Sequence, residues 1–470
     1  MSRLLISAAH KSSGKTTITA GICAAISQRQ LEVQAFKKGP DYIDPMWLGM
    51  ATNRNCHNLD FHNMHSTEIQ SVFQQNSLNA DISIIEGNKG LFDGVDLEGG
   101  NSNAELAKQL RAPVVLVIDC KGMTRGIAPL LLGYQAFDEN IEIAGVILNK
   151  LGGARHERKL REIVAHYTDF PVLGAVQYDA EMEISERHLG LIPSNESIIA
   201  EKKLAYITKQ INKQVNIDKL IAIGQQAVKL PSTQFLHQPI HKKNRVRIGI
   251  AFDKAFGFYY PGDLQALESA GAELVHIDTL NDKILPDIDG LFIGGGFPET
   301  QAESLQANKS LKTQIKHAIE NGLPSYAECG GLMYLSRSLL WHGKHYEMVG
   351  VIPGDTIMHD KPQGRGYMKL KETSNALWPA MSHSQNKSLL NVHEFHYSSL
   401  ENLDPSLEYA YEVKRGHGIT GQHDGIIIHN LLANYAHMRH VEQNRWASRF
   451  INFVNQCKKK DRLLPKKALG

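Results

Sequence analysis

The stretch "LLISAAHKSSGKTT", residues 4–17, decides the fold of the first part of this chain of 470 residues. An apolar run is followed by small and polar residues and then by Gly14, Lys15 and Thr16. This order predicts a buried strand, a loop whose backbone N–H groups cradle phosphate, and a helix. Ala9 replaces the first glycine of the usual G-x-x-x-x-G-K-[ST] pattern. A strand–turn–helix connection without a ligand is the alternative, and the flanking strand and helix disfavour it.

Nucleotide contacts are expected along this loop and at its helix. Lys15 would reach the outer phosphates of a nucleotide, and the Thr16 hydroxyl would bind Mg²⁺. Lys37 and Lys38, at the end of a later apolar run, would neutralise anions, although surface lysines usually have no specific role. The expected nucleotide-binding residues are Ser13, Gly14, Lys15, Thr16 and Thr17.

Acidic residues gather in two further segments at predicted strand ends. "FKKGPDYIDP" contains Asp41 and Asp44, and "IIEGNKGLFDG" contains Glu86 and Asp93. Any one of these carboxylates alone would be interpreted as a solvated turn residue. Because open α/β sheets bind ligands at the carboxyl ends of their strands, two such clusters favour function. We predict Glu86 as a metal ligand, with Asp44 as the second candidate.

Short apolar runs alternate with amphipathic stretches through the first half of the chain. The expected strands lie at residues 3–7, 81–87, 112–120, 141–150 and 170–176, and expected helices at 15–29, 103–110 and 155–165. Continuous apolar strands that alternate with helices predict a parallel sheet covered on both faces.

A second alternating series predicts a second α/β domain. Its expected strands lie at residues 245–253, 272–278, 288–296 and 324–329. The intervening segment is rich in Pro, Gln, His and Lys, which is typical of a linker. The expected division is a first domain at 1–230, a linker at 231–244, a second domain at 245–455 and a basic tail at 456–470.

Composition excludes several classes of protein. A net charge of +2 leaves no footprint for nucleic acid or a membrane surface. No apolar run reaches the roughly 18 residues of a membrane helix. Five scattered cysteines without a C-x-x-C pair argue against a disulfide framework and a structural zinc site. We therefore expect a cytoplasmic protein with reduced thiols.

The stretch "PSYAECGGLMYL", residues 324–335, predicts a nucleophile at a sharp turn. Cys329 follows an expected strand and precedes two glycines and a helix, whose N-terminus lowers a thiol pKa. Upstream, Gly295 and Gly296 in "FIGGGFPE" are candidates for an oxyanion hole. His437, after an apolar segment late in the domain, is the candidate base. Alone, Cys329 would be interpreted as a buried inert thiol.

Together these motifs resemble the CbiA/CobB family, the cobyrinate a,c-diamide synthases, over nearly the entire chain. The shared motifs, in order, are "GKTT", "FKKGPDYIDP", "EGNKGLFDG", "SNAELAKQLRAPVVLVID", "AGVILNK", "FYYPGDLQALESAGAELV", "GGGFPE", "YAECGGLMYL" and "HEFHYSSL". The resemblance implies an N-terminal P-loop synthetase domain, similar to dethiobiotin synthetase, and a C-terminal class I glutaminase domain.

The resemblance also implies roles for single residues. Cys329 matches the family's glutaminase nucleophile, and His437 the histidine that activates it. Glutaminases of this class often have a glutamate two residues after that histidine, and here the place holds Arg439. A Cys–His dyad is therefore expected. The segment "HEFHYS", His393–Ser398, matches a family motif without an assigned chemical step.

The implied reaction uses ATP, Mg²⁺ and L-glutamine to amidate the a- and c-carboxylates of cobyrinate or hydrogenobyrinate in cobalamin biosynthesis. Relatives with the same motifs amidate sirohaem or nickel-sirohydrochlorin, and Asn88 and Lys89 depart from the apolar residues expected of cobyrinate enzymes. A ParA/MinD-like switch ATPase is a further alternative, but it has no use for a glutaminase. The oligomeric state is not predicted. The expected substrate-binding residues are Asp41, Tyr42, Asp44 and Asp93.

Overall fold

The computed structural model describes residues 1–184, 186–187, 190–191, 193–194, 200–231, 245–379 and 389–463. The chain divides into two compact units, Met1–Leu236 and His237–Gly470. The expected linker lies outside the described residues except for Pro231, and the end of the expected basic tail, residues 464–470, lies outside them too. No helix among the described residues is long and apolar enough to cross a membrane.

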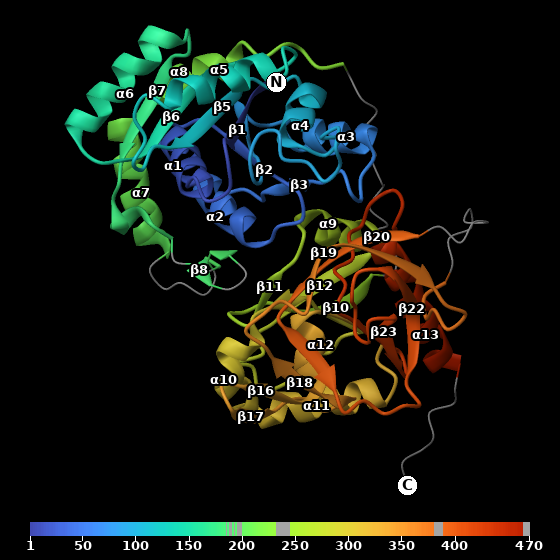
Figure 1. The fold of residues 1–470 in the computed structure, drawn as a ribbon. Helices are drawn as coiled ribbons and strands as arrows, with labels where there is room; N and C mark the ends of the chain where they lie inside the picture. Colours follow the sequence, from blue (N-terminus) through green and yellow to red (C-terminus); the bar gives the residue numbers. More distant parts are fainter. Residues whose placement is uncertain are drawn as a thin grey trace. The chain divides into compact units, whose positions relative to one another are not determined.

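The first unit is built on a seven-stranded parallel sheet, as its continuous apolar runs predict (Figure 1). The strand order is β3-β2-β4-β1-β5-β6-β7. The strands are β1 (Ser2–Ala8), β2 (Val33–Lys38), β3 (His57–Leu59), β4 (Ile82–Glu86), β5 (Val114–Asp119), β6 (Ile143–Leu151) and β7 (Val172–Gln177), and β8 (Glu186–Arg187) and β9 (Gly190–Leu191) form a separate pair.

Helices connect these strands and bury the apolar side chains of the sheet. Helix α1 packs against α2 and α7, and α8 packs on β1 and β4. The helical segments are α1 (Lys15–Ser27), α2 (Ile43–Thr52), α3 (Ser66–Asn76), α4 (Asn103–Leu110), α5 (Ile127–Phe137), α6 (Ala154–Tyr167), η1 (Ala180–Met182), α7 (Ala200–Gln214) and α8 (Ile217–Gln225).

Strand order brings three functional loops to one edge of this sheet. Strand β4 lies between β1 and β2, so the carboxyl ends of these three strands are neighbours. The loops that follow them begin at Ala9, Gly39 and Gly87. Open α/β sheets bind ligands beyond such carboxyl ends. The fold therefore gathers the phosphate loop and both acidic segments.

The second unit contains a nine-stranded mixed sheet of order β12-β10-β13-β15-β24-β23-β22-β19-β20. The first five strands pair in parallel, and the remaining pairs are antiparallel. The strands are β10 (Val246–Ala251), β12 (Ala272–Ile277), β13 (Gly290–Ile293), β15 (Ser325–Glu328), β19 (Gly364–Glu372), β20 (Leu390–His396), β22 (Glu408–Arg415), β23 (His423–Ile428) and β24 (Leu431–Asn434).

Smaller sheets and helices complete this unit (Figure 1). A four-stranded sheet comprises β17 (Lys344–Glu347), β16 (Ser336–Trp341), β18 (Ile352–Met358) and β21 (Ser398–Glu401), and a pair comprises β11 (Phe256–Phe258) and β14 (Gly295–Gly296). The helical segments are α9 (Pro261–Ser269), η2 (Pro298–Gln301), α10 (Ala302–Ala307), α11 (Lys309–Glu320), α12 (Gly330–Leu335) and α13 (Trp446–Leu463). Helix α13 includes residues 456–463 of the expected basic tail.

Candidate functional site

The phosphate loop of the first unit has the backbone that its sequence requires. Gly14 has φ +83°, and a Cβ added there would lie 2.5 Å from Asn149 Nδ2. The same Asn149 amide donates to the Ser13 carbonyl at 2.8 Å, and Lys150 Nζ donates to the Ser12 carbonyl at 2.9 Å. Residues at the carboxyl end of β6 therefore shape the loop, and only glycine fits its last position without strain.

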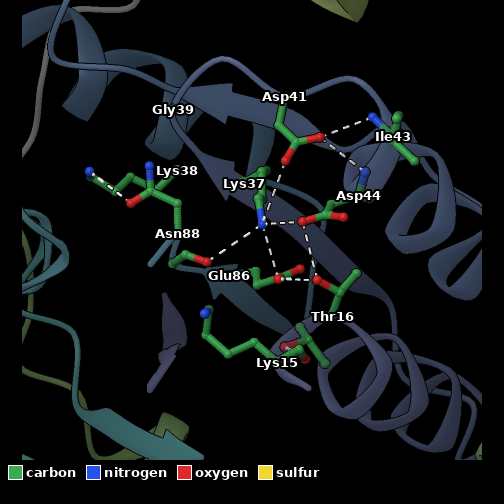
Figure 2. A network of polar contacts seen from close by, with 12 residues as sticks. Lys15, Thr16, Lys37, Lys38, Gly39, Asp41, Ile43, Asp44, Glu86 and Asn88 are labelled. Atoms are coloured by element: carbon green, nitrogen blue, oxygen red, sulfur yellow. Dashed lines mark hydrogen bonds and ion pairs between the residues drawn. The ribbon is translucent and has the colours of Figure 1, made fainter. Parts of the chain in front are cut away.

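A network of buried and half-buried charges lies at the start of α1 (Figure 2). Thr16 Oγ1 donates to Glu86 Oε1 at 2.7 Å and to Asp44 Oδ2 at 3.1 Å. Lys37 Nζ, 3% exposed, lies 2.5 Å from Asp44 Oδ2, 3.0 Å from Glu86 Oε1 and 3.9 Å from Asp41 Oδ2. Three strand ends thus bring one hydroxyl, one ammonium and three carboxylates together.

Burial and mutual charge set the protonation of this network. Burial alone would lower the pKa of Lys37, but the Asp44 and Glu86 carboxylates outweigh it and raise that pKa well above its usual value. Burial, and then the Asp44 charge, raise the pKa of Asp41 to about 7. Burial also lowers the pKa of Lys15 to about 8, with the Lys37 charge contributing. The ammonium of Lys37 therefore balances carboxylates that burial would otherwise protonate.

The oxygen ligands of this network fit Mg²⁺. Thr16, Asp44 and Glu86 supply the hydroxyl and carboxylate oxygens that a hard cation prefers. Glu86 is fully buried, and within the described residues its Oε2 atom has no hydrogen-bond partner. No cluster of three or more His, Cys, Asp or Glu residues suited to a metal occurs in the described part of the chain. An all-protein metal cage is therefore absent from those residues, whereas a site shared with substrate phosphates fits.

The remaining residues predicted for this site have structural contacts as well. Asp41 Oδ1 accepts from the N–H groups of Ile43 and Asp44, at 3.0 and 3.1 Å, and so fixes the start of α2 beside Tyr42. Asp93, which is exposed, accepts from the N–H of Gly90 at 2.9 Å. Ser13 is buried and Thr17 is half-buried in the first turn of α1.

The expectation of surface lysines at positions 37 and 38 is wrong. Both ammonium-bearing side chains are buried, because β2 lies inside the sheet between β3 and β4. Lys38 Nζ donates to Asn88 Oδ1 at 3.1 Å (Figure 2). Burial lowers the pKa of Lys38 to about 8, opposed by the Asp60 charge. Lys89, in contrast, is exposed.

In the second unit, Cys329 stands at a strained turn between β15 and α12. Its φ is +47° and its ψ is −100°, a conformation that L-residues rarely adopt, and its side chain is 6% exposed. The chain turns here because α12 packs against β13 and β14. A Cβ on Gly331 would lie 2.2 Å from the Ile293 carbonyl oxygen, and one on Gly330 would lie 2.9 Å from Gly296 N.

His437 lies beside Cys329. A hydrogen bond joins the two side chains, and His437 Nδ1 lies 3.5 Å from Glu328 Oε2. Burial would lower the pKa of His437, but the hydrogen bond and charge of Cys329, followed by those of Glu328, raise it to about 10. The contacts with Cys329 and Glu328 therefore favour the protonated form of His437.

The candidate oxyanion glycines also lie at this pair. Gly295 and Gly296 form β14, and a Cβ on Gly295 would lie 2.7 Å from His437 Cε1. Tyr259 holds the preceding turn, because its hydroxyl accepts from the N–H of Gly294 at 2.9 Å. The structure thus brings together all four residues predicted for the glutaminase site.

The "HEFHYS" segment has a place in this site that its sequence does not reveal. The His393 ring stacks on that of His437, with centroids 4.9 Å apart, and the His437 N–H donates to the His393 carbonyl at 2.8 Å. The His396 ring stacks on Tyr435 at 3.8 Å. Strand β20 therefore supports the loop that carries His437.

Sequence reasoning missed Glu328 and His393 as members of the site. Glu328 falls within the expected strand at residues 324–329 and receives no role from the sequence, and His393 belongs to a segment without an assigned role. The contacts of both residues are with His437, which is far away in the sequence. An acidic residue inside an apolar run, directly before a nucleophile, was the available signal for Glu328.

Comparison with known proteins agrees with both halves of the chain. The model of the CobQ/CobB/MinD/ParA nucleotide binding domain matches residues 5–192, and that of the CobB/CobQ-like glutamine amidotransferase domain matches residues 247–445. The first model includes MinD/ParA ATPases as well as amidotransferases. The match to the second model, a glutamine amidotransferase domain, distinguishes this chain from the MinD and ParA proteins.

Curated relatives match both domains together. The cobyrinate a,c-diamide synthase of Magnetococcus marinus is 46% identical and covers 94% of this chain and 94% of its own length. That of Methanosarcina acetivorans is 41% identical over 96% of this chain and 94% of its own. With such identity over nearly its full length, the chain belongs to the cobyrinate a,c-diamide synthase family of glutamine amidotransferases.

Proposed function

We propose that this protein amidates the a- and c-carboxylates of cobyrinate or hydrogenobyrinate, with ATP and glutamine as co-substrates. One observation carries the proposal: a phosphate loop with buried acidic partners and a strained cysteine paired with histidine occur in one chain. The names of the curated relatives supply the acceptor. A nucleotide switch or a binding module would need only one of the two sites.

The second unit supports release of ammonia from glutamine. The Cys329 thiolate attacks the side-chain amide carbon, and His437 gives its proton to the nitrogen that leaves as ammonia. Backbone N–H groups at Gly295 and Gly296 would stabilise the developing oxyanion. Water then hydrolyses the thioester, which releases glutamate and restores the thiol.

The first unit supports activation of the acceptor carboxylate. Transfer of the γ-phosphoryl group of ATP to a carboxylate oxygen creates a phosphate leaving group, which ammonia displaces to form the amide. Lys15 and the loop N–H groups would hold the phosphates. Mg²⁺ bound by Thr16, Asp44 and Glu86 would neutralise phosphate charge.

Contacts to the tetrapyrrole are proposed for the loops after β2 and β4. Asp41, Tyr42 and Asp93 lie on these loops, and Asp44 follows in the first turn of α2. The Lys38–Asn88 pair lies there as well, and its buried ammonium suits an anionic acceptor. Because Asn88 departs from the pattern expected of cobyrinate enzymes, the acceptor requires a direct assay.

A panel of acceptors tests the proposal. Purified protein with ATP, Mg²⁺ and glutamine should convert cobyrinate to its a,c-diamide, followed by mass spectrometry. Sirohaem and nickel-sirohydrochlorin, assayed in parallel, should remain unmodified. Amide formation on either of them but not on cobyrinate or hydrogenobyrinate would contradict the proposed acceptor and leave the chemistry of both sites intact.

A further inference from the structure

The glutaminase site holds a buried acidic residue, Glu328, at a position other than the one two residues after the histidine. Arg439 occupies the place, two residues after His437, where related glutaminases often have a glutamate. The Arg439 guanidinium instead lies over the Tyr260 ring, 4.8 Å from its centroid. We propose that Glu328, the residue directly before the nucleophile, is the positioning residue that orients His437 and stabilises its imidazolium.

Glu328 is placed to do two tasks with its two oxygens. Its Oε1 atom accepts from the Met438 N–H at 2.8 Å and from the Tyr326 hydroxyl at 2.5 Å. Its Oε2 atom lies 3.5 Å from His437 Nδ1. The carboxylate therefore fixes the backbone next to His437 and faces the ring nitrogen, while the ring also bonds to the Cys329 thiol.

Independent contacts fix the backbone around His437. Asp424 accepts from the Tyr435 and Ala436 N–H groups, at 3.0 and 2.9 Å, and His393 accepts from His437. Glu328 is thus not required for the general course of this loop. Its distinct contribution is a negative charge at the histidine ring, and that charge favours the protonated form.

Charged and titratable groups surround His437. Glu328, at the end of β15, and Cys329, directly after it, face the ring, and His393 stacks on it from β20. Beyond them lie Tyr326, Asp263 and Arg439, of which Asp263 and Arg439 interact with each other. Glu328 is the carboxylate within 4 Å of the His437 ring nitrogen among the ion pairs of the described residues.

The variant Glu328→Gln tests this inference, which rests on the proposed glutaminase half-reaction. The amide oxygen can still accept from Met438, but the charge is lost and an NH₂ group can face His437. Glutamine hydrolysis, measured as glutamate release, should lose about 10²-fold or more in kcat. The alkaline limb of its kcat/KM profile should move down by about 1 pH unit or more, because the imidazolium loses its counter-charge. Amidation from added ammonia should persist and report an intact fold.

Glu394→Gln is the matched control. Glu394 is a buried carboxylate that accepts from the N–H groups of His417 and Gly418 and lies 3.5 Å from a different histidine, His396. This variant should leave the alkaline limb where it is. Glu328→Asp, which keeps the charge on a shorter side chain, should lose kcat but hold the limb closer to that of the wild type.

The outcomes separate the two hypotheses. An unshifted alkaline limb in Glu328→Gln, or an equal shift in Glu394→Gln, would overturn the role of Glu328. If Glu328→Gln does not fold, Glu328→Asp provides the test, because it keeps the charge. A downward shift of its alkaline limb by about 1 pH unit or more would also overturn the role of Glu328. A wild-type protein that hydrolyses glutamine but forms no amide with either nitrogen source would refute the proposed function alone.

Discussion

The buried Lys37 ammonium contacts three carboxylates of the first unit. Asp41 lies in the loop after β2, Asp44 in the first turn of α2 and Glu86 at the end of β4. A buried charge is costly unless it is paired, and each member of this network satisfies another. Burial would raise the pKa of Asp44, but the charge and hydrogen bond of Lys37, together with bonds to Thr16 and Asp41, hold that pKa below its usual value. The charge of Lys37 is thus needed to keep carboxyl groups ionised at this site.

At this scale we predict that Lys37→Met destabilises the protein by about 3–5 kcal/mol near pH 8. Without the ammonium, burial raises the pKa values of Asp44 and Glu86, so the folded state binds more protons than the unfolded state between their unfolded and folded pKa values. Stability of the variant should therefore fall as pH rises and recover toward pH 5. Urea unfolding at both pH values measures the difference.

Lys108→Met is the matched control for that measurement. Lys108 pairs with Glu105 and Asp138 at the surface, at 3.2 and 3.1 Å. Such pairs contribute about 0–1 kcal/mol. A loss of unfolding free energy in Lys37→Met as small as that in Lys108→Met, or one that does not depend on pH, would show that the network does not need the Lys37 ammonium.

Among the elements, α12 is notable because glycines let it approach β13 and β14 closely. Gly331 lies so near the Ile293 carbonyl that no side chain fits. The turn that holds Cys329 at positive φ depends on this approach. The short helix and the two strands thus store the strained conformation of the nucleophile.

We predict that Gly331→Ala lowers the free energy of unfolding by about 1–3 kcal/mol or more and reduces glutamine hydrolysis, because the added methyl overlaps backbone atoms of β13. Gly262→Ala is the control, since a Cβ there meets no atom within 4 Å in the described residues, and its φ is not positive. Urea unfolding and glutamate release measure both variants. Equal stability of the two would contradict the packing described for α12.

Elements also differ in how far the sequence predicts them. Continuous apolar runs predicted β1, β4 and β5 to within two residues at each end. Strands of a parallel sheet that is covered on both faces have such runs in their sequences. The antiparallel strands from β16 to β23 were not predicted, since their pairing depends on partners far along the chain. The role of His393 was missed for that reason, as it comes from β20 lying against the His437 loop.

For the whole molecule, two compact units each hold one candidate site. The sequence predicted one site in each unit, because each site has its own local motif. It did not predict which lysines are buried, since burial depends on the position of β2 inside the sheet. Motifs identify the chemistry, while neighbours in space decide charge and orientation.

At this scale we predict complementary losses from two variants. Lys15→Ala should lose amide formation from glutamine and from ammonia alike, because Lys15 would hold the phosphates of ATP. The variant should still release glutamate from glutamine. Cys329→Ser should lose only the glutamine-dependent reaction. Parallel assays with each nitrogen source measure both, with Lys108→Met as an active control. Loss of the ammonia-dependent reaction in Cys329→Ser would contradict the assignment of one task to each unit.

The position of Glu328 next to Cys329 has a consequence for control of the glutaminase. The acid and the nucleophile share a peptide bond, and His437 follows β24, the strand that pairs directly with theirs. Two hydrogen-bonded strands of one sheet therefore lead directly to the acid, the nucleophile and the histidine. Gly295 and Gly296 come from a different element, the two-residue strand β14, which packs against the turn of Cys329 through Gly330. A shift of β14 would thus change the oxyanion site and the nucleophile turn together.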